Sequence, residues 1–243
     1  MGKKIDTKII HFGSEPEIHY GSLTDPIYKN STLIFENLKT YQKAKLNKFN
    51  SPYYGRISTY STRRFEKLIS KLYETESGIV TSSGLSAITL TLLSFLSKHD
   101  EIIISKNCYE PVYNFAKYEL QKFGINSHFF ECNNIEQIQT LINKKTKVIY
   151  LESPASLTYE VEDLEKIVKI AKKNKIITII DNTWSTFLGC NPIKYKIDIV
   201  IESATKYFSG HSDNFCGIIA CNSKHYKIIK QTVVRFGDHT TAD

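Results

Sequence analysis

The sequence predicts an α/β fold in which a mostly parallel sheet is sandwiched by helices. Runs of apolar, often β-branched residues at strand length recur along the chain, and they alternate with segments whose apolar residues repeat at helical spacing. Strands that are apolar throughout are buried on both faces, as in parallel sheets that helices cover on each side. In such sheets, the side chains that do chemistry gather at the carboxyl ends of the strands.

Each element has its own signal. The first helix of the regular part is indicated by apolar residues spaced i, i+3, i+4 and i+7 from Phe65 to Leu72. A short strand then begins at Gly78 and breaks into a turn, which opens an apolar helix over 87–96. Further strands are expected at 101–105, 128–131, 147–151, 176–180, 198–201 and 217–220. Further helices are expected at 111–124, which has proline and glycine where each is favoured, and at 135–142, 164–174 and 224–234.

Residues 1–50 are predicted to form an N-terminal extended arm, and residues 51–243 one large domain. The arm lacks clean periodicity and is interrupted by glycine and proline residues between Gly13 and Pro26. A short helix is expected near 38–48. An arm of this kind lies across its own domain or across a neighbouring subunit.

The composition excludes several classes of protein. The net charge of +7 comes almost entirely from lysines spread along the chain, which does not favour nucleic-acid binding. The cysteine number, 5, is odd, and no metal-ligand spacing is present, so a reducing cytosol is favoured over a disulfide framework, and no metal site is expected. The N-terminus lacks a signal-peptide core, and no apolar run approaches membrane-spanning length. We therefore expect a cytoplasmic protein with no membrane partner.

A lysine follows the expected strand 198–201. Lys206 stands at the mouth of the predicted sheet, where an amine can lose its proton and act as a nucleophile. Ser203 and Thr205 flank it and could hydrogen-bond an anion beside the amine. A surface lysine in a lysine-rich chain is the simpler interpretation of this stretch taken alone.

Three further features are expected at the same edge. Ser83, Gly84 and Leu85 open a helix, whose backbone N–H groups and positive dipole end suit a phosphate, although a plain helix cap looks the same. Asp181 ends an apolar strand, so its carboxylate should be buried and need a partner, unless it only caps the next helix with Asn182 and Thr183. Tyr109 lies just past another strand, where its ring could stack on a flat ligand or simply be half-buried at a helix entry.

Together these groups are the ones that pyridoxal 5'-phosphate requires. A lysine binds the cofactor's aldehyde as a Schiff base, a buried acid keeps the pyridine nitrogen protonated, and an anion-binding turn holds the phosphate. The combination, rather than any single member, indicates this cofactor.

The same segments resemble the Cys/Met-metabolism family of enzymes that depend on pyridoxal phosphate, the trans-sulfuration enzymes. The most specific likeness is in the lysine motif, SATKY at 203–207 with GHSD at 210–213, and in the aspartate segment IDNTW at 180–184. Other similar segments are the phosphate turn at 83–85, the loop Tyr54-Gly55-Arg56 and the run at 26–32. The likeness covers nearly the whole chain and implies the large domain of a fold-type I pyridoxal-phosphate-dependent transferase.

Within the family, the segments at 108–111 and 181–184 look most like those of the cystathionine β-lyases. The resemblance therefore implies a β-elimination that converts a cystathionine-like amino acid into homocysteine, pyruvate and ammonia. It implies that Lys206 holds the cofactor and moves protons, and that Tyr109 stacks on the ring and helps to deprotonate the incoming amine. It also implies that Asp181 holds the pyridine nitrogen.

The resemblance implies the phosphate ligands as well. They are the turn Ser83-Gly84-Leu85, the flanking residues Ser203 and Thr205, and Tyr54 with Arg56. Tyr54 and Arg56 would reach the phosphate of a neighbouring subunit in a homo-oligomer, which in this family is a homotetramer. Arginine suits this role because its forked donors match a phosphate.

Two departures from the family leave alternatives open. Ser58 and Tyr60 stand where the family has glycine and proline, and the segment 235–243 resembles the lead-in to a smaller C-terminal domain that supplies the arginine for the substrate carboxylate. The chain would then be truncated before that domain. The alternatives are γ-synthase or γ-lyase chemistry, or a non-catalytic remnant that binds the cofactor without turning over substrate.

Overall fold

A seven-stranded mixed sheet forms the centre of the protein, in a computed structural model that describes residues 5–132 and 134–242. Lys3, near the start of the expected arm, and Asp243, at the end of the expected domain, lie outside the described residues. The spatial order of the strands is β1-β7-β6-β5-β4-β2-β3. Their bounds are β1 Ser77–Thr81, β2 Glu101–Ser105, β3 Asn126–Phe130, β4 Thr146–Glu152, β5 Ile177–Asp181, β6 Ile199–Ser203 and β7 Gly217–Cys221.

One strand runs against the others. β7 is antiparallel to both of its neighbours, β1 and β6, whereas the remaining neighbouring strands pair in parallel. β1 therefore runs in the same direction as β6 although β7 separates them, and the carboxyl ends of all strands except β7 meet at one edge. The prediction of a mostly parallel sheet is confirmed.

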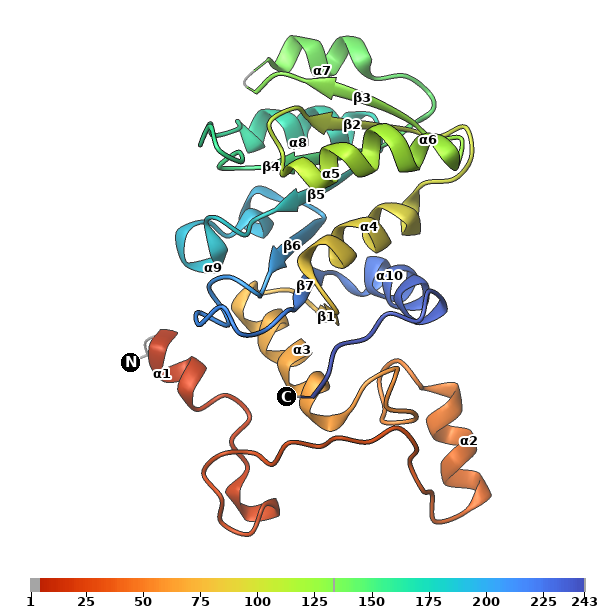
Figure 1. Cartoon of the computed structure of the whole chain (residues 1–243), viewed down its shortest axis with the longest axis vertical. Coiled ribbons are helices and arrows are strands. Elements are labelled where there is room, and N and C mark those ends of the chain that lie inside the picture. Colours follow the sequence, from red (N-terminus) through yellow and green to blue (C-terminus); the bar gives the residue numbers. More distant parts are fainter. Residues whose placement is uncertain (1–4, 133, 243) are drawn as a thin grey trace.

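Helices cover both faces of this sheet (Figure 1). Their bounds are α3 Tyr60–Leu72, α4 Gly84–Phe95, α5 Glu110–Asn114, α6 Leu120–Lys122, α7 Ile135–Leu141, α8 Leu164–Lys173, α9 Thr186–Gly189 and α10 Ser223–Arg235. A π-helical turn, η2 at Phe115–Glu119, joins α5 to α6, so the helix expected over 111–124 is one continuous segment with a wider turn in its middle. A short 3-10 segment, η3 at Pro192–Tyr195, precedes β6.

Two cores result from the alternation of side chains along each strand. Ile104, Tyr150 and Ile179 face the core on the side of α4, α5 and α10. Ile103 and Ile180 face the core on the side of α3, α7 and α8. These side chains are fully buried, and each of the isoleucines contributes roughly 1.5–3 kcal/mol by leaving water. The predicted sandwich of sheet and helices is confirmed.

The segment before α3 is far less buried. It contains α1 Ile5–Ile10, a 3-10 turn η1 at Pro16–Ile18 and α2 Leu38–Leu46, and it runs away from the sheet beyond β1 (Figure 1). Among the described residues up to position 50, only His19 is buried. Apolar side chains such as Ile34 and Leu46 are 97% and 90% exposed. Within the described part of the chain, none of the helices combines the length and the apolar character that a bilayer crossing requires.

Candidate active site

The carboxyl end of β1 leads into the N-terminus of α4. Ser83 caps this helix, because its hydroxyl accepts a hydrogen bond from the N–H of Ser86 at 3.1 Å. The N–H groups of Gly84 and Leu85 lie in the first turn, where a helix offers them no acceptor. Ser82 donates its N–H and its hydroxyl to the Asp238 carboxylate, which fixes the turn from the other side. The turn thus presents donors and the positive end of a 12-residue helix.

The N-terminus of α4 sits directly against the end of β6. A Cβ atom on Gly84 would lie 2.7 Å from the Cβ of Ser203 and 2.8 Å from its hydroxyl oxygen, so a side chain does not fit there. The close approach places the Ser203 hydroxyl beside the first turn of α4. An N-terminal helix turn and a hydroxyl at one point form a cradle that suits a phosphate.

A short series of hydrogen bonds connects this cradle to a buried acid. The N–H of Ser203 donates to the hydroxyl oxygen of Thr183 at 2.8 Å, and the N–H of Thr183 donates to Asp181 Oδ1 at 2.9 Å. Burial raises the pKa of the Asp181 carboxyl, and the hydrogen bonds from Thr183 act in the opposite direction. A buried carboxylate of this kind is stabilised by a cationic partner such as a protonated ring nitrogen.

A second buried acid lies beside the first. Glu152 ends β4, and the parallel register places it opposite Asp181. Its Oε2 accepts the backbone N–H of Tyr109 at 2.7 Å, whereas Tyr109 as a whole is 48% exposed. Burial, and then the charge of Asp181, raises the pKa of Glu152 to about 8. Our sequence interpretation missed Glu152, although a glutamate at the end of an apolar run is the same signal that singled out Asp181.

Lys206 lies in a turn that follows β6. Its N–H donates to the carbonyl of Ser203 at 3.0 Å, and its carbonyl accepts from Gly210 at 2.8 Å, so the backbone of the turn is fixed while the side chain is exposed. The hydroxyl of Thr205 donates to the carbonyl of Cys216 at 3.3 Å and accepts from its N–H at 3.1 Å. The structure therefore brings Lys206 next to Ser203, while the Thr205 hydroxyl is used in holding the turn to β7.

Tyr54 and Arg56 make their contacts elsewhere in the chain. Arg56 Nη1 donates to the carbonyl of Val234 near the end of α10 at 2.7 Å, and its guanidinium lies 5.8 Å from the ring centre of Tyr54. Both residues are exposed. Two other arginines are also engaged within the chain, Arg63 with the carbonyl of Ser51 and Arg64 in an ion pair with the Asp25 carboxylate. The contacts found here do not join Tyr54 or Arg56 to the cradle of the same chain.

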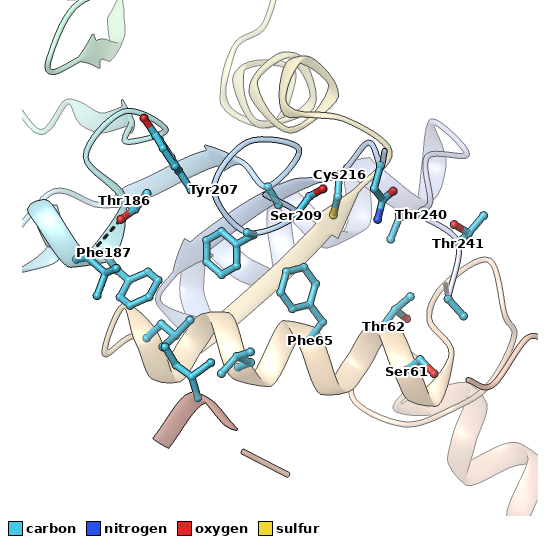
Figure 2. A pocket seen from close by; sticks show the side chains of 18 residues that line it. Ser61, Thr62, Phe65, Thr186, Phe187, Tyr207, Ser209, Cys216, Thr240 and Thr241 are labelled. Carbon is cyan, nitrogen blue, oxygen red and sulfur yellow. Dashed lines mark hydrogen bonds between the residues drawn. The ribbon is translucent and has the colours of Figure 1, made fainter. Parts of the chain in front are cut away.

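An apolar cavity lies behind the lysine turn, on the side of α3 (Figure 2). Its volume is about 570 Å³, and three phenylalanines form much of its wall. Phe65 and Phe187 each place their ring centre 5.8 Å from that of Phe208. The cradle, Asp181 and Glu152 are not among its lining residues. The cavity is therefore separate from the candidate active site.

The fold and these groups together define a class. A mostly parallel sheet that carries an anion-binding helix start, a buried acid and a lysine at one edge is the large domain of a fold-type I pyridoxal-phosphate-dependent enzyme. A solved structure agrees: cystathionine gamma-lyase from Lactobacillus plantarum, complexed with L-serine, superposes with a TM-score of 0.89 at 26% identity. The match covers 99% of this chain and 61% of that one.

The sequence comparison narrows the class to a family. The model of the family described as Cys/Met metabolism PLP-dependent enzyme matches residues 6–242, and the chain belongs to this family. Pyridoxal 5'-phosphate is the cofactor that the family uses. The cradle, the buried Asp181 and the exposed Lys206 fit this group.

Relatives within the family carry several names. An L-methionine gamma-lyase of Fusobacterium nucleatum is 35% identical over 88% of this chain and 54% of its own length. A putative cystathionine beta-lyase of Saccharomyces cerevisiae is 32% identical over 94% of this chain and 66% of its own length. A cystathionine beta-lyase of Escherichia coli is 28% identical over 99% of this chain and 62% of its own length. The chain thus spans between 54% and 66% of these relatives.

Proposed function

We propose that this chain carries the cofactor-binding domain of a carbon–sulfur lyase that cleaves a cystathionine-like amino acid by β-elimination. The products would be homocysteine, pyruvate and ammonia. The observation that carries the proposal is the unbroken series of contacts from Gly84 through Ser203 and Thr183 to Asp181, with Lys206 in the turn that follows. This series joins an anion cradle, a buried acid and an accessible amine.

Each group has a task that its surroundings allow. Pyridoxal phosphate, when bound, supplies a ring that accepts electrons from the substrate Cα. The N–H groups of Gly84 and Leu85 and the Ser203 hydroxyl would bind its phosphate, and Asp181 would hold a proton on its ring nitrogen. Lys206 would hold its aldehyde until the substrate amine displaces the lysine, and the freed amine would then take the proton from the substrate Cα and give a proton to the leaving sulfur as a general acid–base. The Tyr109 ring would pack against the cofactor and help to deprotonate the incoming substrate amine.

The choice of β-elimination rests on local resemblance and on relatives. The segments at 108–111 and 181–184 resemble those of cystathionine β-lyases. Relatives in yeast and in E. coli carry that name. γ-Elimination is the second candidate, because the F. nucleatum relative is a methionine gamma-lyase and the L. plantarum structure is a cystathionine gamma-lyase.

The proposal includes a second copy of the chain. Tyr54 and Arg56 are exposed, and their contacts lie at the end of α10. We assign them to the phosphate of a neighbouring subunit, where the guanidinium fork binds two oxygens at once. The exposed apolar side chains of the first 50 residues would then be covered by that neighbour.

One experiment separates the candidates. The purified chain is incubated with pyridoxal phosphate, reduced with borohydride and digested, and the modified peptide is identified by mass spectrometry. The unreduced protein is then given cystathionine, and the keto acid is identified. Modification at Lys206 with pyruvate release supports the β-lyase, whereas 2-oxobutyrate indicates γ-elimination. Modification without a keto acid indicates binding without turnover, and a lack of modification at Lys206 contradicts the proposal.

A further inference from the structure

A buried polar cluster surrounds Asp181 on the α4 and α5 side of the sheet. Glu152 and Asp181 are register partners on adjacent parallel strands, so their side chains leave the sheet on the same face. Tyr150, two residues earlier in β4, points to that face and is fully buried. Its hydroxyl has no hydrogen-bond partner within the part of the chain that the structure describes. Cys108 is buried in the same cluster. The mechanism above uses only Asp181.

Two carboxyl groups in one buried site do not ionise together at low cost, because like charges repel strongly where water is excluded. The surroundings decide which one keeps the charge. Asp181 accepts from Thr183 and would face the cofactor's ring nitrogen, whereas Glu152 accepts only the N–H of Tyr109 among the hydrogen bonds found for it. The charge therefore belongs on Asp181 and the proton on Glu152.

The remaining groups around Glu152 do not change this assignment. Burial raises the pKa of Cys108 to about 12, and it raises the pKa of Tyr150 well above its usual value. Both groups are neutral in the range where Glu152, with a pKa of about 8, takes up its proton.

We propose that Glu152 is a positioning residue that works as a neutral acid. One oxygen holds the backbone N–H of Tyr109, and the uncharged state of Glu152 leaves Asp181 as the charged member of the pair, the one that would hold the proton on the cofactor's ring nitrogen. This inference rests on the proposed function, because it assigns Glu152 a role toward the same cofactor. Glu152 would act on the cofactor ring through Tyr109 and Asp181, without touching the ring itself.

The link to Tyr109 has a structural reason. Tyr109 is the residue before α5, and no side chain caps that helix start. The hydrogen bond to Glu152 therefore anchors the backbone from which the Tyr109 ring projects. Without the Glu152 oxygen, the backbone of Tyr109 loses this hydrogen bond, and the position of the exposed Tyr109 ring is less well fixed.

The test compares Glu152→Gln with Glu152→Ala. Glutamine has the shape of the protonated acid and keeps an oxygen for Tyr109, whereas alanine removes the acceptor. Glu202→Gln is the matched control. Glu202 is also buried near the end of a central strand, β6, and burial raises its pKa to about 9. Its register places it on the opposite face of the sheet, away from Asp181.

The first readout is cofactor affinity at pH 7, measured by quenching of the chain's single tryptophan. That residue, Trp184, stacks on Tyr207 with ring centres 6.4 Å apart, next to Lys206. Glu152→Gln should bind pyridoxal phosphate within about threefold of the unmodified chain, and Glu152→Ala about tenfold more weakly or worse, the size of one lost hydrogen bond to a buried group. Glu202→Gln should leave the affinity unchanged. Equal weakening in Glu152→Gln and Glu152→Ala would overturn the proposal, because the ionised form would then be required.

The second readout needs no cofactor. An acid with a raised pKa in the folded chain binds its proton more tightly there, so its contribution to stability falls as pH rises from about 4.5 toward 8. The urea midpoint of the unmodified chain should fall across this range, and the fall should be smaller in Glu152→Gln and in Glu202→Gln. An unchanged pH profile in Glu152→Gln shows that Glu152 is not a neutral acid. If the unmodified chain binds no pyridoxal phosphate, the proposed function fails, and this profile decides the state of Glu152 separately.

Discussion

At the scale of single residues, the two groups expected to work together have opposite surroundings. Asp181 is the last residue of β5, between β4 and β6, and is buried, whereas Lys206 lies in a turn past β6 and is exposed. An exposed amine is open to an aldehyde. A buried carboxylate has no water to solvate its charge, so a protonated ring nitrogen is its natural partner. The two residues differ in burial because Asp181 still belongs to a central strand, whereas Lys206 lies in a turn beyond the end of its strand.

Replacing Lys206 with alanine should remove the attachment point of the cofactor. Borohydride reduction should then leave no modified peptide, and keto acid release should fall by about 10²–10⁴-fold or more, because the group that moves the protons is lost. Lys227→Ala is the control, since Lys227 is also an exposed lysine but belongs to α10 and is not one of the residues assigned to the site. A modified peptide that persists in Lys206→Ala would show that another lysine holds the cofactor.

Gly84 illustrates how one absent side chain shapes the cradle. Gly84→Ala should weaken cofactor binding by at least about tenfold and destabilise the fold by about 1–3 kcal/mol, because the added Cβ overlaps Ser203 and moves the start of α4. Titration of Trp184 fluorescence and urea unfolding measure the two effects. Gly189→Ala is a matched control: its Cβ would meet only Ser185 at 3.5 Å, an ordinary contact, so affinity and stability should hardly change.

At the scale of secondary-structure elements, a buried ion pair connects three of them. Lys230 of α10 contacts the Glu66 carboxylate of α3 at 2.5 Å, and the N–H of Val80 in β1 donates to the same oxygen at 3.4 Å. The side chains of Lys230 and Glu66 are 2% and 7% exposed. The pair therefore joins helices on opposite faces of the sheet around its β1 edge. β1 leads directly into the cradle, so the position of the cradle depends on the position of this edge strand.

Lys230→Met should destabilise the chain by about 3–5 kcal/mol, because it leaves the Glu66 carboxylate buried without its counter-charge. Chemical denaturation followed by circular dichroism measures the change. Lys166→Met removes the exposed pair with Asp163 and should have no measurable effect on the midpoint. A similar loss of unfolding free energy in the two variants would mean that burial does not make the Lys230–Glu66 pair more stabilising than an exposed pair.

Strands could be predicted closely because an apolar, β-branched run is a local property. The strand 101–105 matches β2 without change, and β7 begins at Gly217 as expected. α1 was missed, and α9 was expected only as a helix for Asp181 to cap, because six or fewer residues are too short to show a helical repeat. The π-helical turn of η2 leaves no mark on the apolar spacing. Glu152 carries the same local signal as Asp181, the end of an apolar run, but its pairing with Asp181 depends on β4 lying beside β5, and strand order is a property of the whole fold.

At the scale of the whole molecule, the exposed arm and the position of Arg56 point beyond one chain. Apolar side chains along residues 5–50 are largely exposed, and Arg56 rests against the end of α10. Under our proposal the site takes its lysine from one copy and its arginine from another, and it is then complete only in an assembly. In a symmetric dimer each copy gives and receives the same groups.

Mixing two defective variants tests this arrangement. Lys206→Ala and Arg56→Ala are each expected to be impaired, but a mixed dimer contains one site with both native residues. Random reassociation of equal amounts should restore about a quarter of the sites, since half of the dimers are mixed and each restores one site of two. Cofactor fixed by borohydride measures the recovery. If the mixture shows only the average of the two variants, Arg56 serves its own chain.

The antiparallel strand β7 also determines when the site can exist. β1 emerges early in the chain, yet within residues 5–132 and 134–242 its one neighbour in the sheet is β7, which lies more than a hundred residues later in the sequence and separates β1 from β6. The amino end of β7 touches the cradle, because a Cβ on Gly217 would lie 2.2 Å from the carbonyl oxygen of Ser83. During synthesis, β1 and the turn that follows it therefore lack their strand partner until residues 217–221 have left the ribosome, and the Asp238 carboxylate that accepts from Ser82 follows later still. The nascent chain should acquire its affinity for the cofactor only then, in a single late step.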